Sequence, residues 1–141
     1  MGAAPADLHG KRVLVVGGET ALGRALAVGL AEVGVDVAIA SLSPDTKAEF
    51  AINSALNELW ALGRQGLALA IDASDAAQVR DAVARAEREL GRLDLAAAVA
   101  APDEGALALE ALREALAERP VVLLAADAEA ADALRQVREH F

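Results

Sequence analysis

The sequence predicts an α/β protein: a parallel sheet of five strands with helices on both faces, the arrangement called doubly wound. Five short apolar runs alternate with segments of helical periodicity, which is typical of strand-helix-strand units. The runs are continuous rather than alternating with polar residues, as expected for strands buried on both faces of a parallel sheet. A chain of 141 residues, 55% of them hydrophobic, can bury one core. We therefore expect a single domain over residues 1–141, with residues 1–10 as a flexible lead.

The expected strands and helices follow one another without a linker. We predict strands over residues 13–16, 35–40, 66–71, 93–101 and 121–126. The alanines of the fourth run are also good helix formers, but the alternating pattern around them favours a strand. Helices fill the intervals, and three of their starts carry capping residues, which are Ser43 with Pro44 at the first helical position, Ser74 or Asp75, and Asp127.

The stretch from Lys11 to Gly34 carries the clearest functional signal. A buried strand enters a helix through Gly17, Gly18 and Gly23. Without Cβ atoms such a turn can lie close to a ligand, and the free N–H groups and positive dipole end of the helix then face a diphosphate. The same glycines would also serve close packing of the strand against the helix, so both explanations stay open.

The spacing G-x-x-x-A-L-G over residues 17–23, preceded by LHGKRVLVV, resembles the TGxxxGIG nucleotide-binding turn of the short-chain dehydrogenase/reductase family. Val16 replaces the threonine and Ala21 replaces the middle glycine of that motif. The resemblance continues through the Leu-Asp pair at residues 93–94. It implies a Rossmann-type sheet with the strand order 3-2-1-4-5. The flavodoxin-like order 2-1-3-4-5 is the alternative, which the glycine turn disfavours.

The resemblance also implies which residues contact a cofactor, NAD or NADP. The turn would surround the ribose and diphosphate, the end of the second strand would meet the adenosine ribose, and the end of the third strand would meet the adenine. The residues are Gly17, Gly18, Glu19, Thr20, Ala21, Leu22 and Gly23 in the turn, then Ser41, Leu42, Asp72, Ala73 and Ala100. Asp72 also fits a simpler role as a carboxylate beside a helix start.

Residue 41 bears on the choice between the two cofactors. An acidic residue about 20 positions past such a turn accepts hydrogen bonds from the adenosine ribose. Ser41 occupies that position here. The missing negative charge leaves room for a 2′-phosphate and favours NADP slightly. NADP-preferring members of the family usually add an arginine next to it, whereas this chain has Leu42, with Lys47 as the nearest cation.

The catalytic residues that the resemblance would imply are missing. They are a serine, a tyrosine that donates the proton and a lysine three residues after the tyrosine. The chain has no tyrosine, its only lysines are Lys11 and Lys47, and residues 125–126 are alanines where the family has its serine. We therefore predict no catalytic residue and no oxidoreductase activity.

Composition argues against several classes of partner. The net charge of −9 disfavours nucleic acid and anionic membranes. The chain has no cysteine, so it cannot form a disulfide. Its only histidines are His9 and His140, which are too few for a zinc cluster, and we predict no metal site. The first residues lack the pattern of a signal peptide and no stretch is as apolar as a membrane span, so we expect a cytoplasmic protein.

These observations predict an NAD(P)-binding domain that resembles a truncated short-chain dehydrogenase and lacks its activity. One alternative is a structural or interaction module, a decayed, minimised or engineered core, which forms a homodimer through the apolar edge of the fifth strand. Another is an enzyme of different chemistry, whose acid-base or Mg²⁺-binding groups would be Asp103, Glu104 and Asp127.

Overall fold

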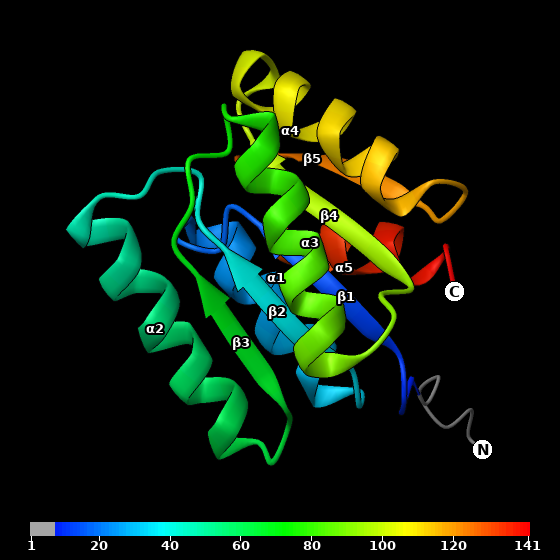
Figure 1. Cartoon of the computed structure of the whole chain (residues 1–141). Coiled ribbons are helices and arrows are strands. Elements are labelled where there is room, and N and C mark those ends of the chain that lie inside the picture. The colour runs from blue at the N-terminus through cyan, green and yellow to red at the C-terminus, as the bar shows by residue number, and fades with distance from the viewer. Residues whose placement is uncertain (1–7) are drawn as a thin grey trace.

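A computed structural model describes residues 8–141, apart from the side chains of Pro102 and Glu104. Its parallel strands have the order β3-β2-β1-β4-β5, which confirms the doubly wound Rossmann-type sheet (Figure 1). The elements in chain order are β1 (Arg12–Val16), α1 (Ala21–Glu32), β2 (Asp36–Ala40), α2 (Thr46–Ala61), β3 (Gly66–Leu69), α3 (Ala76–Leu90), β4 (Leu95–Ala100), α4 (Pro102–Leu116), β5 (Val121–Ala125) and α5 (Ala130–Arg138).

Helices cover both faces of the sheet (Figure 1). Successive residues of β1 point to opposite faces, so Val13 and Val15 join one core cluster and Leu14 and Val16 the other. The first cluster is completed by α1, α2 and α5, and the second by α3 and α4. All four of these β1 side chains are fully buried. This explains why the strand reads as one continuous apolar run.

The first residues of the described chain belong to the fold. Leu8 is buried in the first core cluster, and its N–H donates to the carbonyl oxygen of Val33 over 3.0 Å. Leu8, which lies within the expected lead over residues 1–10, is thus anchored to the rest of the fold. The rest of that expectation, over residues 1–7, lies outside the described residues.

The helix starts differ from the expected ones at two places. Helix α2 begins at Thr46 with Asp45 as its N-cap, since the Asp45 carboxylate accepts from the Ala48 N–H over 2.7 Å. Ser43 instead forms a turn before the helix, its hydroxyl accepting from the Asp45 N–H. Helix α5 begins after Glu129 rather than at Asp127, without a side-chain cap. Helix α3 is capped by Asp75, one of the two expected residues.

Three strands are shorter than expected at their carboxyl ends. Strand β3 ends at Leu69 rather than at residue 71, β4 ends at Ala100 rather than at residue 101, and β5 ends at Ala125 rather than at residue 126. Within residues 8–141, no helix is long and apolar enough to cross a membrane.

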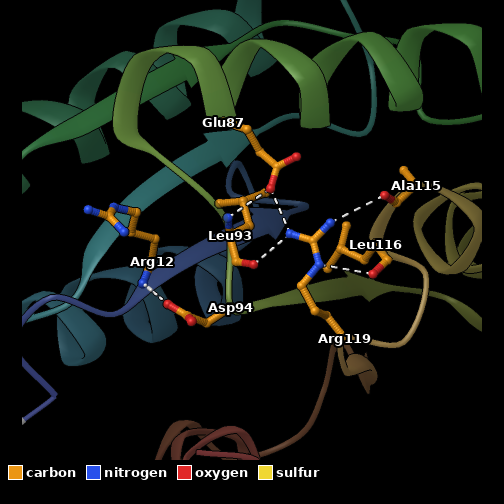
Figure 2. A network of polar contacts seen from close by, with 7 residues as sticks. All are labelled: Arg12, Glu87, Leu93, Asp94, Ala115, Leu116 and Arg119. Atoms are coloured by element: carbon orange, nitrogen blue, oxygen red, sulfur yellow. Dashed lines mark hydrogen bonds and ion pairs between the residues drawn. The ribbon is translucent and has the colours of Figure 1, made fainter.

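A polar network joins three elements at the amino end of β4 (Figure 2). The Arg119 guanidinium donates to the Glu87 carboxylate over 2.6 Å, to the Leu93 carbonyl over 2.7 Å and to the Leu116 carbonyl over 3.0 Å. Glu87 also accepts from the Leu93 N–H over 2.9 Å. On the other side of the strand entry, the Arg12 N–H donates to the Asp94 carboxylate. The network therefore ties the end of α3, the entry to β4 and the end of α4 together.

Replacing Arg119 with Met should destabilise the fold by about 2 kcal/mol, because it leaves carbonyl groups and a partly buried carboxylate without their donor. The measurement is urea unfolding followed by circular dichroism. Arg135→Met is the matched control, since Arg135 pairs with Asp132 and Glu139 on the surface and its side chain is 63% exposed. Its loss should cost less than about 0.5 kcal/mol. Equal effects of the two substitutions would contradict a structural role of the network.

The contribution of Glu87 should depend on pH. Burial raises the pKa of its carboxyl, but hydrogen bonds from Arg119 and the Leu93 N–H and the charges of Arg119 and Arg92 outweigh burial and lower the pKa. Because the folded pKa lies below the unfolded one, the stabilisation is complete above about pH 4.5 and is lost as the pH falls through the lowered value. The stability difference between wild type and Arg119→Met should therefore shrink below that pH in urea titrations, and a constant difference would contradict it.

Candidate functional site at the carboxyl ends of the strands

The three glycines of the turn are packed closely against other parts of the chain. A Cβ atom on Gly17 would lie 2.2 Å from the Val99 carbonyl oxygen, and one on Gly18 would lie 2.0 Å from a methyl carbon of Ile39. At Gly23, the same atom would lie 2.1 Å from the Gly17 carbonyl oxygen. Gly17 also has a φ of +93°, which favours glycine. Close packing of the turn against β4, against β2 and against its own backbone therefore requires these glycines, whether or not a ligand binds.

The start of α1 is the part of the turn that is suited to an anion. The Thr20 hydroxyl accepts from the Gly23 N–H over 2.9 Å and donates to the Gly17 carbonyl over 2.7 Å, which fixes the first turn. Ala21 is the first helical residue and is exposed, whereas Leu22 is buried in the core. The N–H groups of the first helical turn have no acceptor within the helix. The Gly23 N–H is already bonded to Thr20, so the N–H groups of Ala21 and Leu22 are the donors that this helix start offers beside the open surface at Ala21.

The end of β2 is arranged differently from the sequence-based expectation. Ser41 is fully buried, and its hydroxyl accepts from the Ile71 N–H over 3.0 Å and donates to the Ile71 carbonyl over 3.2 Å. It fastens β2 to the segment after β3. The N–H of Leu42 donates to both carboxylate oxygens of Glu19, over 3.0 and 2.8 Å, and the N–H of Ser43 donates to Oε2 over 3.3 Å. A carboxylate thus lies at this strand end after all, and it comes from the glycine turn.

A pocket of about 330 Å³ opens beside this strand end. It brings together three of the expected cofactor residues with residues from α4, and its lining consists of Leu42, Asp72, Ala73, Ser74, Asp103 and Leu107. Hydrogen bonds from the Ser74 hydroxyl and then the Ser74 N–H lower the pKa of the Asp72 carboxyl. One Asp72 oxygen accepts both bonds, over 2.5 and 2.9 Å. Asp72 therefore closes the turn before α3, whose N-cap is Asp75, and it also lines the pocket.

The remaining expected positions lie around β4 and β5. Ala100 is buried at the end of β4, where a Cβ atom on Gly105 would lie 3.6 Å from its own. Asp103 and Asp127 are exposed, and the Glu104 side chain is not described. Among the side chains that the structure does describe, no group of three or more His, Asp or Glu residues is placed to hold a metal ion.

Comparison with known proteins identifies the family. A family model described as short chain dehydrogenase matches residues 11–121. The chain belongs to the short-chain dehydrogenase family. This confirms the resemblance found in the sequence, and the Rossmann-type sheet described above is that of the family's solved members.

Three similar proteins illustrate how far the likeness to the short-chain dehydrogenases extends. L-rhamnose 1-dehydrogenase (NAD(P)(+)) of Sphingomonas sp. (strain SKA58) is 40% identical over 88 residues, which are 62% of this chain and 33% of that protein. The uncharacterized oxidoreductase YhxD of Bacillus subtilis (strain 168) is 36% identical over 105 residues, covering 74% of this chain and 34% of that protein. The crystal structure of a blue fluorescent protein from a metagenomic library, in complex with NADPH, superposes with a TM-score of 0.73 and 26% identity, over 83% of this chain and 56% of that chain. The chain thus spans about a third of the length of these curated relatives.

Substituting Gly17 with Ala should destabilise the fold by about 3 kcal/mol or more, because the new methyl group meets the Val99 carbonyl and the backbone has positive φ. Gly63→Ala is the matched control, since Gly63 has a φ of +77° and no atom within 4 Å of its Cβ position. Its cost should be about 1 kcal/mol, from the backbone alone. Thermal and urea unfolding measure both, and equal costs would show that packing at the turn is not the cause.

Proposed function

We propose that this chain binds a nicotinamide dinucleotide, NAD or NADP, across the carboxyl ends of β1, β2 and β3. The observation that carries the proposal is the combination of an exposed helix start at Ala21 with the neighbouring pocket that contains Leu42, Asp72 and Ala73. Donors for a diphosphate and an apolar-edged pocket for an adenine lie at adjacent strand ends, as in other dinucleotide-binding sheets. Family membership and the NADPH complex of a structural relative support the same assignment.

In this proposal the residues of the chain bind and orient the dinucleotide. The first turn of α1, fixed by Thr20, binds the diphosphate through its N–H groups, and Leu42 and Ala73 contact the adenine. When bound, the nicotinamide ring of such a cofactor accepts or donates a hydride. The chain contains no tyrosine, so it offers no phenol to donate the accompanying proton. We therefore propose dinucleotide binding without oxidoreductase turnover by this chain alone.

A second candidate function is assembly with another copy of the chain. Strand β5 lies at an edge of the sheet, with Leu123 partly exposed, and Leu107 on the adjacent helix α4 is 53% exposed. An edge strand with apolar side chains is a site at which another strand can pair. Sedimentation equilibrium at increasing concentration tests this second function, and a monomer throughout would exclude it.

Substituting Ala21 with Asp should weaken binding of NADH about tenfold or more, because a carboxylate at the first helical position repels the diphosphate. The same substitution should leave the fold intact or slightly more stable, since acidic residues are favourable at a helix start and Ala21 is exposed. Isothermal titration calorimetry measures the affinity, and thermal unfolding checks the fold.

Ala21→Asn is the matched control for this experiment. It has nearly the same size and no charge, so binding should fall much less than in Ala21→Asp. Failure of the wild-type chain to bind NADH or NADPH at millimolar concentration would refute the proposed function. Equal losses in the two variants would mean that the start of α1 does not contact the phosphates.

A further inference from the structure

The Glu19 side chain reaches from the glycine turn to the segment that follows β2. Three hydrogen bonds from the N–H groups of Leu42 and Ser43 hold its carboxylate there. These two N–H groups follow β2 directly, at the position where a dinucleotide-binding sheet meets the adenosine ribose. The carboxylate therefore stands where an acidic residue at position 41 would otherwise be expected.

The bonding of this carboxylate leaves capacity for a ligand. A carboxylate has about four acceptor positions on its two oxygens. Glu19 uses one bond on Oε1 and two on Oε2. Oε1 can therefore accept a further hydrogen bond, such as one from a ribose hydroxyl group.

The charges around Glu19 do not favour a further anion. A small pocket of about 170 Å³ beside it is lined by Asp45 and Lys47 as well as by Glu19 itself. The single cation faces two carboxylates, and one of these, Asp45, is held in place as the N-cap of α2. A phosphate at the ribose would add charge to a net negative surrounding. It would also find the Leu42 and Ser43 N–H groups already occupied.

We propose that Glu19 determines the cofactor preference of this chain, by accepting a hydrogen bond from the adenosine ribose and excluding a 2′-phosphate, so that the chain prefers NAD(H) to NADP(H). The inference rests on the proposed dinucleotide binding. It reverses the slight preference for NADP expected from Ser41, because that expectation assumed that no carboxylate lies at the end of β2. Ser41 itself is occupied by Ile71 and takes no part in the choice.

The test is calorimetric titration with NADH and with NADPH, which differ only by the 2′-phosphate, on wild type and on Glu19→Gln. The amide of glutamine keeps an oxygen that accepts from the Leu42 and Ser43 N–H groups, and it removes the negative charge. Wild type should bind NADH about tenfold or more tightly than NADPH, and Glu19→Gln should reduce that ratio about tenfold. Glu89→Gln removes one charge at the exposed far end of α3, and it should leave the ratio unchanged.

The possible outcomes separate this inference from the proposed function. If wild type binds both cofactors equally, or NADPH more tightly, the inference is overturned and dinucleotide binding stands. If wild type prefers NADH and Glu19→Gln behaves like Glu89→Gln, the preference has another cause and Glu19 is not its determinant. If wild type binds neither cofactor, both the proposed function and the inference fall. The wild-type ratio needs no variant, so a folding defect of Glu19→Gln would not hide the first of these results.

Discussion

The arrangement at the carboxyl ends of the strands depends on the close approach of the glycine turn to β2 and β4. Gly17 and Gly18 both donate to the carbonyl oxygen of Ala40, over 2.8 and 3.1 Å, so the chain leaves β1 directly over the end of β2. No side chain fits between the turn and Val99 or Ile39. Because the turn is held in this way, α1 begins close to the sheet and Glu19 lies within reach of the next strand end.

The polar groups at the two ends of the sheet differ in their bonding and accessibility. At the amino ends, Arg119 and Glu87 satisfy one another and four backbone groups, and both are at most partly exposed. Such a network stabilises the entry to β4 and leaves little capacity for a ligand. At the carboxyl ends, Glu19 and Asp72 are held by backbone N–H groups while they line pockets. Polar groups that are oriented but still accessible are suited to binding.

The sheet could be predicted from the sequence because its signal is repeated along the whole chain. Buried strands such as Val13–Val16 must be apolar on both faces, and the helices between them fix parallel pairing. The helix starts were harder to predict from the sequence. Ser43, Pro44 and Asp45 are three consecutive residues that favour a helix start, and local hydrogen bonds determine which of them is the N-cap. Glu19 was expected to contact a cofactor from the turn, but the position of its carboxylate at the end of β2 could not be predicted from spacing, because its partners at residues 42 and 43 are neighbours only in the folded chain.

Because packing alone requires the glycines of the turn, their presence is weak evidence for a ligand, and other residues must supply that evidence. Gly17, Gly18 and Gly23 would be needed in a protein that bound nothing, since their Cβ positions are filled by protein atoms. Ala21 is exposed and Asp72 lines a pocket, so neither is required by core packing, whereas Leu42 lines the same pocket and also packs against the second core cluster. A motif recognised by its glycines thus identifies the fold of this chain, while the side chains between and beyond the glycines determine what the fold can bind. Glu19 is such a side chain: the turn places its carboxylate at the end of β2, where its charge would act on the dinucleotide that we propose to bind there.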